Sequence, residues 1–339
     1  MNILNIEHVS KVFGEKVVLD DVSYGVHQGD KIGIIGINGT GKSTILKIIG
    51  GLEEPDEGQV ITQNGLRITY LPQMPEFPQG ASVLDYVAEG KWQKDWSTES
   101  EARNVLNKLG ITDHEEKIDH LSGGQKKRVA LARTLVNPCD VLLLDEPTNY
   151  LDAEHIAWLK RYLQEYENAF ILISHDIPFL NSVVNLIYHM DNQQLNRYVG
   201  DYDKFQEVYA VKKAQLEAAY RRQQQEISEL KDFVARNKAR VATRNMAMSR
   251  QKKLDKMDLI ELAAEKPKPE FNFRYGRTPG KMLFETKKLV IGYDEPLSKP
   301  LDFYMERGQK IALIGTNGIG KTTLLKSILG LIPSLKGNC

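Results

Sequence analysis

The sequence predicts an α/β fold with a mixed sheet core and a helical subdomain, followed by a long helical hairpin and the start of a second, similar domain. Three observations lead to this prediction. Short, wholly apolar runs alternate with helical patterns, as in a sheet covered by helices. The segment Lys31–Leu52 recurs as Lys310–Leu331. Between the two copies, a long stretch has helical periodicity without glycine or proline.

Composition limits the number of domains and the kind of surface. A chain of 339 residues suggests roughly two domains of about 150 residues each. The formal net charge is zero, so we expect no general attraction to nucleic acid or membranes, only local basic surface. Cys139 and Cys339 form no disulfide framework, and a reducing cytoplasm suits them. With neither a signal peptide nor an apolar run of about 18 residues, we expect a cytoplasmic protein that does not span a membrane.

The first domain, residues 1–203, contains eight predicted strands. The stretch from Gln73 to Ser122 is mostly helical and has the size of an ordinary helical subdomain. The strands are expected, in order, at Asn2–Glu7, Val17–Val22, Lys31–Ile35, Leu66–Leu71, Val141–Leu144, Ala169–Ile173, Ile187–His189 and Asn196–Tyr198.

A phosphate-binding loop follows the third predicted strand. Gly36–Ser43 reads G-x-x-x-x-G-K-S, with a strand before it and a predicted helix, Ser43–Ile49, after it. Its glycines let backbone N–H groups curl around phosphate oxygens, and the helix N-terminus adds favourable partial charge. We expect Lys42 to reach the β- and γ-phosphates and Ser43 to ligate Mg²⁺. The residues expected to bind ATP here are Gly36, Asn38, Gly39, Gly41, Lys42, Ser43 and Thr44.

A second group of motifs fills Leu121–Asp152. A turn at Ser122, Gly123 and Gly124 opens a basic amphipathic helix, predicted at Lys126–Val136. The apolar run Val141–Leu144 then carries two adjacent carboxylates, Asp145 and Glu146, to its carboxyl end, where open α/β sheets place their chemistry. A turn and Asp152 close the stretch. A buried strand can end in acids by chance, but these parts in this order indicate a functional site.

The ordered set resembles the signature motif, Walker B motif and D-loop of an ABC-type ATPase, which is a P-loop NTPase. The resemblance implies that Asp145 holds Mg²⁺ and that Glu146 polarises the attacking water, since phosphoryl transfer mainly needs a positioned nucleophile and charge stabilisation. It also implies that Ser122, Gly123 and Gly124 face the γ-phosphate held by the other ATPase domain. Asp152 would couple the two sites.

Three further residues match this family through their order along the chain. Phe13, in the turn between the first two predicted strands, has the place of the aromatic residue that stacks on adenine, with a core role as the alternative. Gln73, after Leu66–Leu71, resembles the Q-loop glutamine, which helps to coordinate Mg²⁺ and senses the γ-phosphate. His175, after Ala169–Ile173, resembles the switch histidine that contacts the γ-phosphate, with a structural role as the alternative.

Residues 204–280 form the predicted linker. Phe205–Ala235 has apolar residues at helical spacing and predicts a helix of roughly 45 Å. A second helical run, Leu254–Ala264, is expected before the prolines at 267 and 269. Met246 and Met248 could pack against a ribose or base, or against the other helix.

The tip of this linker, residues 236–253, contains seven basic residues and no acidic one. Such a segment repels itself unless it meets phosphates, so it indicates RNA contact; a charged spacer with a solvated tip is the alternative. No aromatic residue lies in it, so base stacking is not indicated. The RNA-contact candidates are Arg236, Lys238, Arg240, Arg244, Arg250, Lys252 and Lys253.

The second domain begins near residue 281 with the repeated segment, which matches the first copy at about two positions in three. Thr322 takes the place of the first Mg²⁺-ligating serine. The chain ends at Cys339 before any second Q-loop, signature or Walker B motif, so we expect a truncated product or part of a longer two-domain protein. The nucleotide-binding residues expected here are Tyr293, in the place of Phe13, and Gly315, Asn317, Gly318, Gly320, Lys321, Thr322 and Thr323.

Two ABC domains, residues 1–203 and 281–339, joined by a helical linker with a basic tip and with no membrane span, resemble the ABC-F family. The resemblance implies ATP and Mg²⁺ as cofactors, ATPase activity, and the ribosome as partner. The linker would reach toward the P-site tRNA and rRNA, and a second ABC domain would act in cis. The implied role is in translation or in antibiotic resistance. The short segment between Gln73 and Ser122 departs from members that carry a large arm there.

Two alternatives remain: an ABC ATPase that binds particular nucleic-acid structures, and the ATPase subunit of a membrane transporter. Competition between branched DNA and ribosomes tests the first, and co-purification with a membrane partner tests the second. In either case, the signature motif of the first domain would serve the nucleotide of the second. We therefore expect a polypeptide of these 339 residues to bind ATP at Lys42 but to hydrolyse it slowly.

Overall fold

The computed structural model describes residues 1–92, 94–237, 244–259, 271–272, 276, 280–293, 295–315 and 319–338. It contains two compact units. The first unit comprises Met1–Gln73, Pro138–Pro147 and Tyr162–Pro267, and the second comprises Met74–Asn137, Thr148–Arg161 and Lys268–Cys339.

A six-stranded sheet, in the order β5-β6-β7-β3-β8-β9, forms the centre of the first unit. Its first five strands are parallel, and β9 is antiparallel to β8. Every residue of β6 and β7 is buried, as their wholly apolar sequences predict. Parallel pairing brings the carboxyl ends of β3, β6 and β7 to one edge. The strands are β3 (Lys31–Gly36), β5 (Ile68–Leu71), β6 (Val141–Asp145), β7 (Ala169–Ile173), β8 (Leu186–Asp191) and β9 (Gln194–Val199).

An antiparallel sheet, in the order β2-β1-β4, covers the helix that follows the phosphate-binding loop. Its strands are β1 (Asn2–Phe13), β2 (Lys16–His27) and β4 (Glu57–Thr62). Helix α1 (Lys42–Ile49) buries Ile45 and Leu46 in one core with side chains from both sheets. The loop before α1 is therefore supported by a helix whose buried face is packed against the antiparallel sheet.

The predicted helical subdomain lies in the second unit. It contains α2 (Val83–Glu89), α3 (Thr98–Lys108), a 3₁₀ turn (Ile118–His120) and α4 (Gly123–Leu135), and α2, α3 and α4 pack against one another. Helix α5 (Ala153–Glu165) follows the Walker B region, and the short helix α6 (Ile177–Val183) belongs to the first unit.

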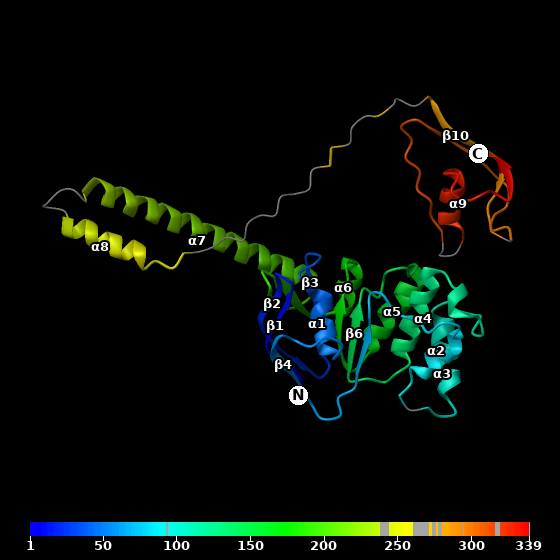
Figure 1. Ribbon diagram of the computed structural model, residues 1–339, viewed down its shortest axis with the longest axis horizontal. Coiled ribbons are helices and arrows are strands. Elements are labelled where there is room, and N and C mark those ends of the chain that lie inside the picture. Colours follow the sequence, from blue (N-terminus) through cyan, green and yellow to red (C-terminus); the bar gives the residue numbers. More distant parts are fainter. Residues whose placement is uncertain are drawn as a thin grey trace. The chain divides into compact units, whose positions relative to one another are not determined.

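The linker begins with α7 (Tyr202–Asn237), a single helix of 36 residues (Figure 1). Helix α8 (Arg244–Asp255) packs against it, with Ala247 on α8 and Val234 on α7 both buried. The second helix was expected at 254–264, which is wrong for the described residues: α8 ends at Asp255, and residues 256–259 are not helical. The small side chain of Ala247 allows α8 to pack closely against α7. Met246 and Met248 are exposed and do not pack between the helices.

The second copy of the repeat is only partly folded like the first. Strands β10 (Met282–Val290), β11 (Leu301–Glu306) and β12 (Lys336–Asn338) form a sheet in the order β11-β10-β12, and α9 (Lys321–Ile328) follows the second loop. Residues 310–315, the copy of β3, form no strand, and Ile314 is 92% exposed. The reason is that β3 lies between β7 and β8, and the 339 residues contain no second copy of either.

Within the described ranges, no helix is both long and apolar enough to cross a membrane.

Candidate functional site

The first phosphate-binding loop has a backbone that only glycine allows at two positions. Gly41 has φ 104°, and an added Cβ would lie 2.5 Å from Cγ1 of Val18. At Gly36 an added Cβ would lie 2.7 Å from the carbonyl oxygen of Met190. The loop is thus a close-fitting cradle of backbone, with room for phosphate oxygens rather than side chains.

Gly41→Ala is expected to destabilise the chain more than Gly51→Ala. Both glycines have positive φ, but nothing lies within 4 Å of a Cβ added at Gly51. The larger loss at Gly41 combines the contact with the branched side chain of Val18, for which overpacking costs about 1–3 kcal/mol, with a φ of 104° that lies further from the left-handed region than the 68° of Gly51. Chemical denaturation of both variants measures it. Equal losses would show that the Val18 contact relaxes freely.

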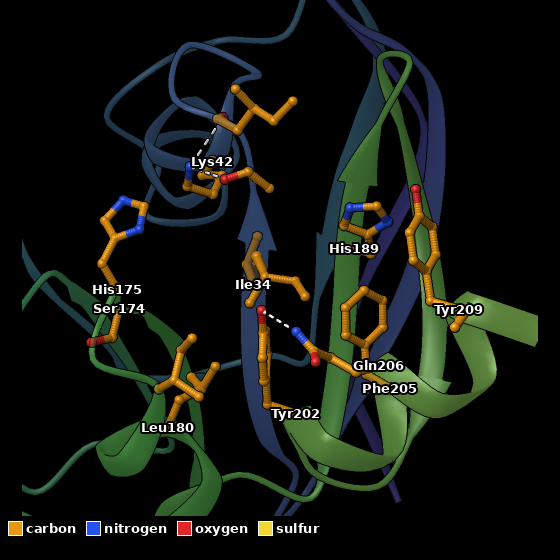
Figure 2. A pocket seen from close by; sticks show the side chains of 15 residues that line it. Ile34, Lys42, Ser174, His175, Leu180, His189, Tyr202, Phe205, Gln206 and Tyr209 are labelled. Atoms are coloured by element: carbon orange, nitrogen blue, oxygen red, sulfur yellow. Dashed lines mark hydrogen bonds between the residues drawn. The ribbon is translucent and has the colours of Figure 1, made fainter. Parts of the chain in front are cut away.

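Lys42 points into this cradle (Figure 2). Its Nζ donates hydrogen bonds to the carbonyl oxygens of Gly36, at 2.8 Å, and Ile37, at 3.1 Å. Burial lowers the pKa of Lys42, while the carboxylates of Glu146 and Asp145 partly oppose this shift. An ammonium group held at the loop, with two acids near it, fits a phosphate chain with a bound Mg²⁺.

The two predicted carboxylates lie at the carboxyl end of β6, and both are buried. Burial raises the pKa of Glu146, the adjacent Asp145 adds to this effect, and His175 and Lys42 oppose it. Glu146 has φ 55°, which is unusual for a residue with a side chain, and its N–H donates to the carbonyl oxygen of Ile173 at 2.9 Å. Strain of this kind persists where surrounding structure holds it, and it is concentrated at functional sites.

His175 completes a cluster of three predicted residues. Its Nε2 lies 3.1 Å from Oδ1 of Asn38 and 3.4 Å from Oε1 of Glu146. Its backbone N–H donates to Oε2 of Glu146 at 3.3 Å. The side chain is 62% exposed, so it contacts the acid while staying accessible to a ligand. Three loops that are far apart in sequence thus meet here.

Tyr70 is a residue of this site that the sequence interpretation missed. On β5 it pairs with Leu143 of β6, so its side chain is on the same face of the sheet as Asp145. Burial and the negative charge of Asp145 raise the pKa of Tyr70. The sequence could have indicated this residue. If the strand before Gln73 pairs in parallel with the Walker B strand, Tyr70 and Asp145 occupy neighbouring positions on one face of the sheet.

The other predicted residues of the first unit are placed as follows. Phe13 ends β1 with 48% of its surface exposed, so it is not a core residue and its ring is accessible. Gln73 is exposed after β5, where it ends the first of the three segments of the first unit. Ser43 and Thr44 are partly buried in the first turn of α1.

The signature turn lies in the second unit and forms a capping box at the start of α4. Oγ of Ser122 accepts from the backbone N–H of Gln125 at 3.3 Å, and Oε1 of Gln125 accepts from the N–H of Ser122 at 2.9 Å. A Cβ added at Gly123 would meet nothing within 4 Å, and at Gly124 it would meet only Tyr150 at 3.7 Å. The box holds an open helix N-terminus, which suits an anion.

Asp152 is held within its own domain. Its Oδ1 accepts from the backbone N–H of His155 at 3.1 Å and lies 2.5 Å from Nδ1 of the same residue. Burial opposes the shift, but these hydrogen bonds lower the pKa of Asp152. Its predicted coupling of two sites stays a prediction.

The second loop repeats one contact of the first. Nζ of Lys321 donates to the carbonyl oxygen of Gly315 at 2.7 Å, as Lys42 does to Gly36. Gly320 has φ 98° before α9, whose first residues include Thr322 and the buried Thr323. Tyr293 is 60% exposed. Asn317 and Gly318 lie outside the described residues.

The candidate RNA contacts fall into three groups. Arg250 and Lys253 contact α7: the guanidinium lies 3.5 Å from the ring centroid of Phe233, and Nζ of Lys253 lies 2.6 Å from Oε1 of Glu226. Lys252 is exposed, and exposed Arg236 lies 3.9 Å from Asp232. Lys238, Arg240 and the side chain of Arg244 lie outside the described residues.

Comparisons with known proteins agree with this site. The family described as "ABC transporter" matches residues 19–149 and 298–339, and a second family with the same description matches 188–273. The "Uncharacterized ABC transporter ATP-binding protein YfmM" of Bacillus subtilis is 55% identical over all of this chain and 73% of its own length. YfmR of the same organism is 35% identical over 97% of this chain, and "Probable ATP-binding protein YheS" of Haemophilus influenzae is 34% identical over 96%.

Solved structures also match. The ATP-binding cassette MJ1267 of an ABC transporter matches at 28% identity with a TM-score of 0.50, covering 59% of this chain and 92% of its own. The match to an ATP-binding cassette, together with the phosphate-binding loop, the signature turn and the Walker B acid pair, identifies an ABC-type ATPase. The chain belongs to the ABC ATPase family. The predicted resemblance is therefore confirmed as far as membership of that family. It spans 58% of the length of YfmR and 56% of that of YheS.

Proposed function

We propose that this chain is part of an ABC-F ATPase that acts on the ribosome, with the α7–α8 hairpin as the RNA-contacting element. The observation that carries the proposal is the hairpin itself: a 36-residue helix extends from a nucleotide-binding domain to a segment rich in basic residues. Neither ATP binding nor packing of the cassette requires the part of this hairpin that extends beyond the base of α7. A charged segment of this kind is stabilised when it neutralises phosphates.

In the described part of the hairpin, some basic residues contact the other helix and others have exposed side chains. Arg250 and Lys253 fasten α8 to α7 through Phe233 and Glu226. Lys252 and Arg236 keep exposed side chains. The first pair thus sets the shape of the hairpin, and the second pair supports contact with an RNA backbone.

Three side chains of this chain supply groups that ATP hydrolysis needs at the first nucleotide site. Lys42 binds phosphate oxygens from the cradle, and Glu146 orients the water that attacks the γ-phosphate. His175 holds Glu146 through the contacts already described. Bound Mg²⁺, held by Ser43 and Asp145, would neutralise phosphate charge. The buried Glu146, with its raised pKa, is suited to accept a proton from that water.

The proposal predicts ribosome binding that depends on ATP and on exposed charge in the hairpin. The double variant Arg236→Glu/Lys252→Glu is expected to weaken co-sedimentation with ribosomes in the presence of ATP. The slope of log affinity against log salt should fall by about one for each phosphate that the variant no longer neutralises. Lys108→Glu, an exposed change on α3, is the matched control and should bind as the wild type does.

Absence of ribosome binding at low salt, by a chain that binds ATP, would overturn the ribosomal role. Branched DNA that competes better than ribosomes at fixed salt would favour the nucleic-acid-structure alternative. The name of YfmM, an ABC transporter ATP-binding protein, supports a third candidate, the ATPase subunit of a transporter. Co-purification of this chain with an integral membrane protein would favour that candidate.

We also propose that a polypeptide of these 339 residues binds ATP but hydrolyses it slowly. Its first nucleotide site needs a signature turn facing it from another ABC domain, and the only such turn in these residues is Ser122–Gly124. Phosphate release measured against protein concentration tests this. Rapid release at all concentrations would show that one domain suffices.

A further inference from the structure

One cavity of the first unit is bounded both by the nucleotide site and by the base of the linker helix (Figure 2). Its volume is about 500 Å³. On one side lie residues of the nucleotide site, namely the phosphate-binding loop residues Gly36, Ile37 and Lys42 and the predicted switch histidine, His175. On the other side lie Tyr202, Phe205, Gln206 and Tyr209 of α7. The first turns of the linker helix therefore form one wall of the cavity beside the phosphate-binding loop.

Aromatic packing fixes α7 in this position. His189 on β8 lies with its ring centroid 5.1 Å from that of Phe205 and 5.0 Å from that of Tyr209. Phe205 also contacts Tyr198 on β9 at 5.0 Å and is itself buried. We call His189, Tyr198, Phe205 and Tyr209 the aromatic joint. Burial lowers the pKa of His189, so its ring is neutral at pH 7 and packs without the cost of a buried charge.

The aromatic joint is connected to the phosphate-binding loop through one strand pair. His189 and Met190 on β8 are paired with Ile35 and Gly36 on β3. The space between Gly36 and the carbonyl oxygen of Met190 is too small for a Cβ, which would lie 2.7 Å from that oxygen, so the backbones of the two paired residues approach each other closely. Close-packed contacts of this kind transmit displacement rather than absorb it.

Lys42 supplies the change that nucleotide binding would make. Its ammonium group is bound to the carbonyl oxygens of Gly36 and Ile37, and both residues line the cavity. A phosphate group competes for that ammonium group. Binding therefore alters the hydrogen bonds of the two loop residues that lie between Lys42 and the aromatic joint.

We propose that the aromatic joint couples occupancy of the first nucleotide site to the order of the linker helix, within the first domain and without a second ABC domain. The proposal rests on ATP binding at Lys42 and on the linker as the working element. His189 and Tyr209 are positioning residues, not catalytic ones. A ligand that orders one wall of the cavity lowers the entropic cost of ordering the other. Coupling free energies are reciprocal, so loosening the joint must also weaken ATP binding.

Amide hydrogen exchange of residues 202–215 in the 339-residue chain, with and without ATP and Mg²⁺, tests the coupling. In the wild type, ATP is expected to slow exchange there. In Tyr209→Ala this slowing should disappear, and the Kd for ATP should rise about fivefold, the lower end of typical allosteric couplings. Val211→Ala, on the same helix and 57% exposed, is the matched control and should respond as the wild type does.

Further variants keep the outcome decisive. Tyr209→Phe keeps the ring and should retain the ATP response, whereas Tyr209→Leu keeps apolar bulk without the ring and should lose it; this pair replaces Tyr209→Ala if that variant does not fold. His189→Ala combined with Tyr209→Ala should cost no more ATP affinity than either change alone. A wild type that binds ATP without slower exchange in α7, or a Tyr209→Leu variant that keeps the response, would overturn the coupling. A wild type that does not bind ATP would instead overturn the proposed function.

Discussion

Lys42→Ala is expected to remove high-affinity ATP binding while leaving the fold intact. The ammonium group of Lys42 is bound inside the first phosphate-binding loop to the carbonyl oxygens of Gly36 and Ile37 and is buried, whereas that of Lys16, which donates to the carbonyl oxygen of Gly39, is on an exposed side chain. Truncating one partner of a desolvated charge pair costs about 2–5 kcal/mol, so the Kd for ATP should rise by at least about 30-fold. Titration of the purified chain with a fluorescent ATP analogue measures this.

Lys47→Ala is the control for this experiment. Lys47 lies on the same helix, α1, but is exposed and outside the loop. The two variants lose the same charge and similar side-chain length, so a general charge effect would weaken both equally. An unchanged Kd in Lys42→Ala would show that nucleotide does not bind in this loop.

Glu146→Gln is expected to raise the thermal stability of the nucleotide-free chain at pH 7. Because burial raises the pKa of Glu146, the folded state holds the proton more tightly than the unfolded state. Stability therefore falls as the pH rises from the ordinary carboxyl range through the raised pKa, so at pH 7 the buried carboxyl group destabilises the fold. Glutamine removes this penalty. Each kcal/mol recovered corresponds to about 2–4 °C in Tm for a domain of this size.

The same variant should bind ATP but lose hydrolysis. A group that handles the proton of the attacking water contributes about 10²–10⁴-fold, so phosphate release in a protein with both ABC domains should fall by that factor. Glu165→Gln, an exposed change on α5, is the matched control for both measurements. A Tm difference that persists below about pH 4, where the carboxyl group is protonated in both states, would contradict the assignment of the stability effect to ionisation.

The sequence predicted the elements that are buried or carry a strong motif. The strands that became β6 and β7 were identified because both faces of each are covered, which leaves an uninterrupted apolar run. The loop at Gly36–Ser43 was identified because glycine is required there by backbone geometry that no other residue allows. Asp145 and Glu146 followed from the strand that carries them.

What the sequence could not predict depends on contacts between distant segments. The second linker helix was placed too late because its position is set by packing of Ala247 and Arg250 on α7, not by its own periodicity. Tyr70 was missed because its neighbourhood with Asp145 exists only once β5 is paired with β6. Residues 310–315 repeat the sequence of β3 but form no strand, because a central strand requires partners on both sides.

Because α7 is long, a small rotation about its base, which acts as a fulcrum, moves its far end by a large distance. A helix of 36 residues is about 54 Å long. A rotation of only about 5° at its first turn would therefore carry its far end sideways by about 5 Å, nearly one helical pitch. The rings of His189, Phe205 and Tyr209 lie at that fulcrum. Rotations of α7 that are too small to disturb the sheet thus produce large displacements where the basic residues lie. Substitutions near the fulcrum should therefore change the position of these basic residues more than substitutions near the tip.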